Sequence, residues 1–351
     1  MGSGGRTILY VGPLMHGGTC LQRLWALQDL GYNVIGVESG IPSRFSPASK
    51  FAYRAWRKVF PALEGLRINH SVISMAKTIK PELVWIDKGL VIRAQTLRDL
   101  KSNSRQPLIV SFSPDDMMNP HNQSKDYLES IALYDHHITT KSYNVSELKI
   151  LGAKDVIMVD NAFCRRSHIP VSLTPEQRAV RGGPVGFIGF WEQEREDFMV
   201  YLAQHGVPIR IWGAWKKNPH IPNNMRIEKE LAWGRDYAAT ISSFDINVGF
   251  LRKINRDLQT TRSIEIPACG SFMLAERTDE HLSLFKEGEE AEFFDCKEEL
   301  LEKVTYYMTH EDQRQRVAQA GYCRCIVGGY SYTERLRKVM QRILEGKNVE
   351  Q

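Results

Sequence analysis

The sequence predicts an α/β protein built from two Rossmann-like domains whose parallel sheets face a central cleft. Segments typical of strand, glycine turn and helix recur in both halves of the chain, as at residues 6–37 and 184–197. Short apolar runs bounded by turn residues, such as residues 83–87 and 244–250, are typical of strands buried on both faces of a parallel sheet. Residues 161–183 are rich in Arg, Ser, Pro and Gly and lack apolar periodicity, which indicates a linker.

The length of the chain and that linker together predict the domain organisation. A chain of 351 residues is long enough for two separate hydrophobic cores. We predict a first domain over residues 1–170, a second over residues 171–330 and a terminal helix over residues 331–351. Hydrophobic residues make up 42% of the sequence and charged residues 25%, which is ordinary for a globular protein.

The first half opens with a strand at residues 7–12, a helix of apolar residues at helical spacing, and a second strand at residues 33–37. The loop after the first strand runs from Gly12 to Gly17 with four residues between them. Gly18 stands where a phosphate-binding P-loop needs Lys, so this is not a Walker motif. The loop is not a GxGxxG fingerprint either, which disfavours a dehydrogenase.

The remainder of the first half repeats the strand and helix pattern. We expect helices at residues 67–80, 96–101 and 142–152 and strands at residues 83–87, 107–112, 136–140 and 155–160. Asp115 and Asp116 lie in the turn beyond the carboxyl end of one of these strands, the rim where open sheets bind ligands. Their carboxylates are placed to meet a substrate hydroxyl, or they shape a Pro-Asp turn. For His136 and His137 we expect packing roles, because no metal-ligand spacing surrounds them.

Charge is unevenly distributed along the chain. Residues 1–170 hold 21 Lys and Arg against 14 Asp and Glu, a balance of +7, so the rest of the chain carries −2 of the net +5. Within that half, residues 41–60 interleave aromatic with basic side chains. Such a surface fits an acidic substrate or an anionic membrane; the alternatives are a solvated basic face and a helix whose aromatics pack inward.

Cysteine usage and hydropathy indicate the compartment. The six cysteines are scattered, and the close pair at residues 323 and 325 is not a CxxC, so we expect reduced thiols and no zinc site. No apolar run approaches the roughly 20 residues that a membrane span needs. We therefore expect a cytoplasmic protein and leave open a peripheral association with the inner face of the membrane.

The second half opens with a strand whose end is bracketed by Gly186 and Gly189, followed by a helix that begins at Trp191 and Glu192. The next strand, residues 207–212, ends at Trp212. Downstream we expect helices at residues 230–244, 297–310, 311–325 and 330–344 and strands at residues 244–250, 271–275 and 291–295.

Residues 252–276, RKINRDLQTTRSIEIPACGSFMLAE, gather charges, hydroxyls and a helix start between two strand-like runs. Thr260, Thr261 and Ser263 are candidate N-caps for a short helix over residues 263–270. A helix that begins beyond the carboxyl end of a strand offers unpaired N–H groups to an anion such as a diphosphate. The formal positive charge of this stretch comes from Arg252, Lys253, Arg256 and Arg262.

Asp257 and Glu265 stand eight positions apart in this stretch, and the helix ends in Ala-Cys-Gly. This resembles the donor-binding element of GT-B glycosyltransferases, two acids separated by seven residues with a small residue, Cys and Gly after them. The longer string TTRSIEIPACGSFMLAERTDEHLSLF, followed by EAEFFDCKEELLEKVTYYMTHEDQRQRVAQAG and YSYTERLRKVM, looks like the CgeB-like branch, named for spore maturation protein CgeB. That resemblance covers residues 184–345, and its one departure is Asp at the first acid, where many retaining members carry Glu.

The resemblance implies a GT-B glycosyltransferase that moves a sugar from a nucleotide diphosphate sugar, with a UDP-sugar as the expected donor, to a hydroxyl acceptor. It implies that Glu265 binds the ribose hydroxyls and Asp257 the sugar, with Gly189 near the phosphates. The aromatic ring of Trp212 either borders the nucleobase or is a core or lid tryptophan. The terminal helix is expected to cross back to the first domain.

The leaving diphosphate must be stabilised as the sugar departs. Arg252, Lys253 and Arg262, helped by Thr260 and Thr261, would do this in place of a metal ion. We therefore expect no metal and no other cofactor.

On the acceptor side, the resemblance places His16, Gly17 and Gly18 near the reaction centre; the alternative is a tight turn with an exposed histidine. An inverting reaction needs a base, for which His16 or Asp115 is available. A retaining reaction can use the diphosphate itself, and the central loop resembles retaining members. The expected acceptor is a glycan, a lipid-linked or a small molecule, in polysaccharide or glycoconjugate biosynthesis.

Two other functions use the same fold. A nucleotide-sugar epimerase would convert the donor without an acceptor, and a non-catalytic protein would bind the nucleotide sugar without turning it over. Nucleic-acid binding is disfavoured, because no recognised module accompanies the modest positive charge.

Overall fold

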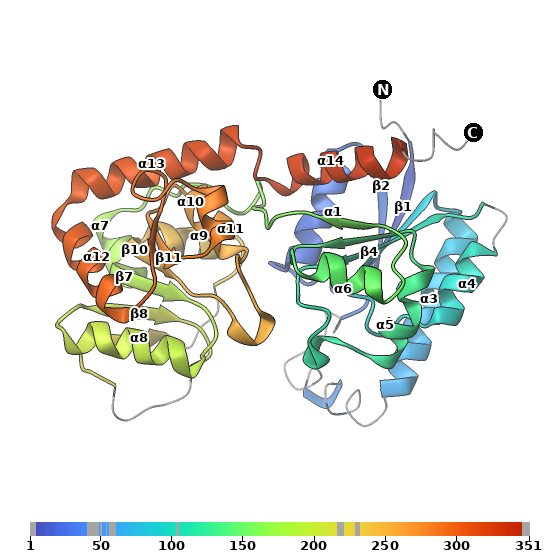
Figure 1. The fold of residues 1–351 in the computed structure, drawn as a ribbon, viewed down its shortest axis with the longest axis horizontal. Coiled ribbons are helices and arrows are strands. Elements are labelled where there is room, and N and C mark those ends of the chain that lie inside the picture. Colours follow the sequence, from blue (N-terminus) through green and yellow to red (C-terminus); the bar gives the residue numbers. More distant parts are fainter. Residues whose placement is uncertain are drawn as a thin grey trace. The chain divides into compact units, whose positions relative to one another are not determined.

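The computed structural model describes residues 5–40, 49, 51–53, 55, 61–102, 105–215, 221–228 and 232–345. The basic and aromatic stretch at residues 41–60 therefore lies almost wholly outside the described residues. The chain divides into two compact units, the first comprising Met1–Asp160 and Tyr332–Gln351 and the second Asn161–Ser331 (Figure 1).

In the described part of the first unit, six parallel strands form one sheet in the order β2-β1-β3-β4-β5-β6. The strands are β1 (Thr7–Gly12), β2 (Asn33–Glu38), β3 (Leu83–Asp87), β4 (Leu108–Ser113), β5 (His136–Thr139) and β6 (Val156–Met158). Strand β2 pairs with one side of β1, and the chain then crosses over so that β3 pairs with the other side of β1. All five residues of β3, LVWID, are buried, as expected of a strand covered on both faces.

Helices cover both faces of this sheet, and the last of them comes from the far end of the sequence. The helices are α1 (Thr19–Asp29), α3 (Pro61–Ile79), α4 (Ala94–Lys101), α5 (Lys125–Ser130), α6 (Asn144–Ile150) and α14 (Tyr332–Glu345). The terminal helix α14 packs on α1 (Figure 1). Its Arg335 pairs with Asp160 at 2.7 Å, so this helix is held on the first unit by charge as well as by packing.

A buried ion pair lies between β1 and β3, where the direction of chain winding changes. The guanidinium of Arg23 is 2.7 Å from Asp87 Oδ1, and the two side chains are 1% and 0% exposed. Tyr10 donates its hydroxyl to the same carboxylate. The guanidinium also lies 4.2 Å from the ring centroid of Phe112 and 5.8 Å from that of Tyr332. Because a buried charge is costly unless it is paired, this cluster fixes α1, β3 and α14 relative to one another.

In the described part of the second unit, six parallel strands form a sheet in the order β12-β11-β10-β7-β8-β9. The strands are β7 (Gly183–Ile188), β8 (Ile209–Trp212), β9 (Met225–Glu228), β10 (Phe244–Gly249), β11 (Met273–Glu276) and β12 (Glu292–Phe294). The helices are α7 (Pro175–Arg181), α8 (Gln193–Gln204), α9 (Arg235–Ser242), α10 (Arg262–Ala268), α11 (Asp279–Leu284), α12 (Lys297–Thr309) and α13 (Glu311–Val327). Here the winding changes direction between β7 and β10.

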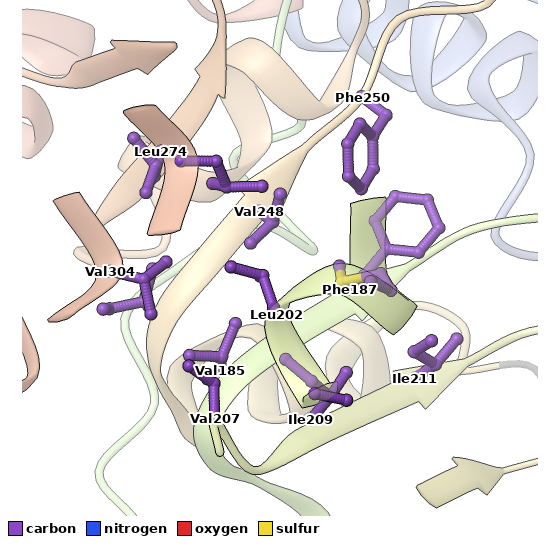
Figure 2. Packing of buried hydrophobic residues seen from close by; sticks show 14 of the residues in the cluster. Val185, Phe187, Leu202, Val207, Ile209, Ile211, Val248, Phe250, Leu274 and Val304 are labelled. Carbon is purple, nitrogen blue, oxygen red and sulfur yellow. The ribbon is translucent and has the colours of Figure 1, made fainter. Parts of the chain in front are cut away.

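Figure 2 shows the apolar core on one face of this second sheet. Side chains from β7, β8 and β10 meet Leu202 of α8 and Val304 of α12 there. At one end of the core, the rings of Phe187 and Phe250 meet edge to face with centroids 5.3 Å apart. Phe187 is the next-to-last residue of β7 and Phe250 directly follows β10, so both rings lie near the carboxyl edge of the sheet.

Several elements differ from the sequence predictions. The predicted linker at residues 161–183 contains α7, which begins with a capping box formed by Thr174 and Gln177. Residues 161–170, which we had placed in the first domain, belong to the second unit: Asn161 N–H bonds to Gln259 Oε1 at 3.0 Å, and Phe163 N–H to Tyr330 O at 3.2 Å. Strand β9 was missed because only its first residue is buried. Among the described residues, no helix has the length and apolar character that crossing a membrane requires.

Candidate functional site

The candidate site lies in the second unit, at the carboxyl edge of the sheet between β7 and β10. In open α/β sheets, ligands bind outside the carboxyl ends of the strands where the winding changes direction. The segments that leave these two strands are residues 189–192 and 250–261. They carry most of the side chains that the sequence analysis named for donor binding.

Arg195 of α8 joins these two segments, and the sequence analysis missed it. Its guanidinium donates to Phe190 O at 3.0 Å and to Leu251 O at 3.2 Å. Only 6% of the residue is exposed, and burial lowers the pKa of its guanidinium. The guanidinium also lies 5.7 Å from the ring centroid of Phe187. In the sequence, a buried arginine in the first turn of a helix looks the same as one that is exposed to solvent. The role of Arg195 therefore becomes visible only from its contacts in the structure.

Three further cations surround this buried arginine. Arg262 donates from Nε to Ile188 O, the last carbonyl of β7, at 2.6 Å. Arg252 Nε lies 3.1 Å from Glu192 Oε1 and its side chain is 56% exposed. Lys253 pairs with Glu276 at the end of β11 and is 54% exposed. With Arg195 these side chains bring four positive charges to one edge of the sheet.

Two carboxylates balance part of that charge. Glu192 lies 3.3 Å from the Arg195 guanidinium as well as beside Arg252. Glu276 accepts the backbone N–H of Leu251 at 2.7 Å. Arg252 and Lys253 are more than half exposed, so part of this positive charge faces solvent at the edge of the sheet. An edge of this kind favours a bound anion.

Glu265, the second acid of the sequence motif, is nearly buried on α10. The residue is 6% exposed, and its Oε2 accepts the hydroxyl of Tyr237 at 2.7 Å. Its Oε1 lies 3.7 Å from His168 Nε2, beyond hydrogen-bond distance. Within the described part of the chain, no Lys or Arg forms an ion pair with this carboxylate. It therefore keeps acceptor capacity for a ligand.

Asp257, the first acid of the motif, has a different environment from the one we expected. Its Oδ1 accepts the Asn255 side-chain amide at 2.7 Å, and its Oδ2 lies 3.4 Å from the backbone N of Arg252. The residue is 8% exposed. In this structure Asp257 braces the loop that carries Arg252 and Lys253, because its oxygens bond to that loop.

The start of α10 also differs from the expectation. Thr261 is the N-cap residue, but its side chain makes no capping hydrogen bond. The N–H groups of Ser263, Ile264 and Glu265 already bond to Thr260 O or Thr261 O at 2.8–3.1 Å. The prediction of unpaired N–H groups for an anion is therefore wrong at these three residues, and the arginines remain as its partners.

Ser263 instead anchors the loop before α10. Its hydroxyl accepts the Thr260 N–H at 3.1 Å and lies 2.6 Å from His281 Nε2. His281 Nδ1 lies 2.7 Å from Glu276 O, a carbonyl that can only accept. The ring proton is thus on Nδ1, and Ser263 donates to Nε2. The chain of hydrogen bonds ties Thr260 to the end of β11.

Gly189 and Trp212 have structural partners. The Gly189 N–H donates to Trp212 O at 2.9 Å, and the Gly189 carbonyl accepts from the Trp215 indole at 2.9 Å. The Gly189 N–H is therefore already occupied, contrary to a role in phosphate binding through that group. The indole of Trp212 donates to Arg181 O at 2.9 Å, a contact that fits the structural alternative for this tryptophan.

The first unit contains the residues named for the acceptor. The loop after β1 turns through Gly17, with φ of +79°, and α1 begins after Gly18. His16 is exposed there. Glu38, at the end of β2, accepts the N–H of Leu14 at 3.2 Å and so holds this loop.

Asp115 and Asp116 have separate environments. Asp115 pairs with Lys88 and its side chain is 22% exposed. Asp116 is 1% exposed and its Oδ1 accepts from the Asn144 amide at 2.9 Å and from Met118 N–H at 3.0 Å. Asp116 therefore shapes the turn, and the prediction that it meets a substrate hydroxyl is wrong because the carboxyl is buried and engaged. In the described residues we find no group of three or more Asp, Glu, His and Cys side chains arranged to hold a metal ion.

A comparison of the sequence with family models matches residues 195–341 to a family described as Glycosyl transferase-like. This span is less than half of the chain and includes Arg195, Arg252, Arg262 and Glu265. A search of curated proteins gave no match.

Solved structures match nearly the whole chain. Sucrose-phosphate synthase from Thermosynechococcus elongatus has a TM-score of 0.67 at 11% identity, with 97% of this chain and 100% of that chain covered. HepE of Anabaena in complex with UDP has a TM-score of 0.64 at 12% identity, with 97% and 100% covered. A candidate UDP-N-acetylglucosamine 2-epimerase from Listeria monocytogenes has a TM-score of 0.57 at 8% identity, with 97% and 96% covered. These similarities confirm the predicted α/β fold class, in which two parallel sheets match the GT-B architecture.

Proposed function

We propose that this protein is a glycosyltransferase that moves a sugar from a nucleotide diphosphate sugar, with a UDP-sugar as the first candidate, to a hydroxyl acceptor. The observation that carries the proposal is the carboxyl edge of the second sheet, where four cations and a buried carboxylate with free acceptor capacity lie on neighbouring segments. A nucleoside diphosphate has the complementary groups: two phosphates and a ribose diol. The match of residues 195–341 to glycosyl transferase-like domains supports the same function.

The donor would be held by this edge. Glu265 accepts hydrogen bonds from the ribose hydroxyls, and Arg252, Lys253 and Arg262 bind the diphosphate, with Thr260 and Thr261 beside them. Arg195 keeps the two strand ends in place beneath them. Asp257 acts on the sugar through the loop that it braces. HepE of Anabaena has been solved with UDP, with UDP and glucose, and with UDP-glucose, which supports UDP as the first nucleotide to test.

In the reaction, the bond between the anomeric carbon and the diphosphate oxygen breaks and a bond from the acceptor oxygen to that carbon forms. Negative charge develops on the leaving diphosphate, and fixed cations stabilise it without a metal ion. We propose retention of configuration, in which the acceptor proton passes to the departing diphosphate. If configuration inverts instead, His16 or Asp115 of the first unit is the candidate base. The CgeB-like resemblance, the acceptor class and a peripheral association with the membrane belong to this proposal as expectations.

The test uses a panel of nucleotide sugars with and without candidate glycan, lipid-linked and small-molecule acceptors. Released nucleotide and the glycosylated product are measured together. We expect nucleotide release that depends on both donor and acceptor and continues in the presence of EDTA. Isomerised donor formed without any acceptor would contradict a transferase and favour an epimerase, and tight binding without turnover of any donor would favour a binding protein.

A further inference from the structure

The carboxylate of Glu265 has two neighbours that the sequence motif does not contain, Tyr237, which hydrogen-bonds to it, and His168, which lies beside it. Tyr237 of α9 donates its hydroxyl to Glu265 Oε2 at 2.7 Å. Burial raises the pKa of Tyr237 well above its usual value, and the neighbouring carboxylate raises it further. The phenol therefore stays protonated and acts as a donor throughout the neutral range.

His168 faces the other oxygen of the same carboxylate. Its Nδ1 accepts the backbone N–H of Cys164 at 3.1 Å, so in the neutral ring the proton is on Nε2. Nε2 is the atom that lies 3.7 Å from Glu265 Oε1. His168 is 3% exposed, and burial lowers its pKa, which keeps the ring neutral. The rings of His168 and Tyr237 meet edge to face with centroids 5.6 Å apart, so each limits the movement of the other.

Neither contact neutralises the carboxylate. A carboxylate has about four acceptor positions, of which Tyr237 uses one. Burying a carboxylate among neutral groups costs free energy, and further hydrogen-bond donors reduce that cost. Two hydroxyls on adjacent carbons would supply two such donors, provided that the carboxylate plane is already oriented.

We infer that Tyr237 and His168 are positioning residues that fix the orientation of Glu265 for a vicinal diol, and thereby set the preference of the site for ribonucleotides over deoxyribonucleotides. This inference rests on the proposed function, because it takes the ligand to be a nucleoside diphosphate. It goes further by assigning the selectivity for the sugar of the nucleotide to residues outside the acid pair. The discriminating quantity is the ratio of two affinities, which a general loss of stability does not change.

The experiment measures Kd by calorimetry for UDP and for 2′-deoxy-UDP with the native protein and Tyr237→Phe. One hydrogen bond to a charged group is worth about 1.5–3 kcal/mol, so we expect the native protein to prefer UDP by about ten- to hundredfold. In Tyr237→Phe we expect that ratio to fall by about threefold or more. An unchanged ratio in this variant would overturn the inference while leaving nucleotide binding intact.

The chain offers a matched control. Tyr307 donates its hydroxyl to Glu292 Oε1, also at 2.7 Å, but Glu292 is at the start of the edge strand β12. Tyr307→Phe removes the same hydroxyl from a tyrosine–carboxylate hydrogen bond of the same length, although Glu292 keeps Lys303 as a partner, and we expect it to leave the ratio unchanged. If it lowers the ratio as much as Tyr237→Phe does, the effect is global and the inference is wrong.

A second pair of variants keeps the test decisive if Tyr237→Phe fails to fold. His168→Gln places an amide donor near the position of the Nε2–H and should retain much of the preference, whereas His168→Leu should reduce it. Equal ratios in these two variants and the native protein would count against the inference. Failure of the native protein to bind any nucleoside diphosphate would instead refute the proposed function, and equal native affinity for UDP and 2′-deoxy-UDP would refute the inference alone.

Discussion

Replacing Arg195 with methionine tests whether the site depends on a buried guanidinium that joins two strand ends. The side chain makes two hydrogen bonds to carbonyls, to Phe190 O at 3.0 Å and Leu251 O at 3.2 Å, in a residue that is 6% exposed. Methionine has similar length and fills most of the space, so the loss of packing is small. The expected loss comes from the two carbonyls: Leu251 O is buried and would have no donor, whereas Phe190 is 58% exposed and its carbonyl is only partly shielded from water.

The magnitude follows from those two contacts. A hydrogen bond to a charged group contributes about 1.5–3 kcal/mol, and leaving a buried acceptor without a partner costs about 1–3 kcal/mol. Glu192 keeps Arg252 at 3.1 Å as its partner, so its charge is not left unpaired. We therefore expect Arg195→Met to lower the free energy of unfolding of the second unit by about 2–4 kcal/mol, of which about 1–3 kcal/mol comes from the buried carbonyl and about 1 kcal/mol from the other.

The measurement is urea denaturation combined with hydrogen exchange of peptides that cover β7 and β10. Arg178→Met is the matched control, because Arg178 pairs with Asp245 at 2.6 Å while the two side chains are 44% and 36% exposed. An exposed pair of this kind contributes about 0–1 kcal/mol. If the two variants differ by less than about 1 kcal/mol, the estimate for a buried, hydrogen-bonded arginine is refuted. If Arg195→Met is destabilised yet binds UDP as tightly as the native protein, then UDP binding does not depend on Arg195 joining the ends of β7 and β10.

The remaining predictions concern the ligand and pH. Arg262→Ala should weaken binding of UDP by about 1.5–3 kcal/mol but that of uridine much less, as measured by calorimetry, because only the diphosphate needs the cation; equal losses for both would contradict this role. Glu265→Ala should weaken binding of UDP by about 1–3 kcal/mol, and an unchanged Kd would mean that the ribose binds elsewhere. Hydrogen bonds from Arg277 lower the pKa of Glu299 from 4.5 to about 2. Since the folded state holds the lower pKa, this stabilisation is complete above pH 4.5 and is lost as the pH falls toward 2. Arg277→Ala should therefore destabilise the protein by about 2–3 kcal/mol at pH 6 but much less at pH 2.5 in urea denaturation, and a pH-independent difference would contradict the linkage.

The architecture could be predicted from the sequence because its signals are local. The run LVWID of β3 and the run FDINVG of β10 each read as buried strands, and each is one. Strand β9 has the sequence MRIE and only Met225 is buried, so nothing local separates it from a loop. Helix α7 was predicted as linker because its composition is polar, although its Thr-Pro-Glu-Gln start is a capping signal.

A candidate site could be predicted from the sequence, but the contacts of its residues could not. The motif placed Glu265 and Arg262 on the same helix start, and both lie there. The partners that decide what Glu265 does are Tyr237 and His168, which are 28 and 97 positions away in the chain. Spacing within a motif carries no information about contacts at that separation. The case of Asp257 differs, because its partners Asn255 and Arg252 lie in its own loop, and spacing alone does not show that they occupy its carboxylate oxygens.

The distribution of charge shows why local geometry outweighs the net balance. The first half of the sequence carries +7 and the remainder −2, which taken alone would place an anion-binding site in the first half. Yet the second unit gathers Arg195, Arg252, Lys253 and Arg262 at one edge of its sheet, because α8, the segment after β10 and the start of α10 all converge where β7 and β10 end. Most of the acidic excess of that half lies elsewhere, for example around Arg277 and Lys303, where Glu287, Glu299 and Glu292 are already paired. A paired carboxylate contributes little to the potential felt by a ligand several residues away, whereas cations at the rim of a partly buried edge are weakly screened. The proposed anion binding thus depends on which cations the topology leaves exposed where β7 and β10 end.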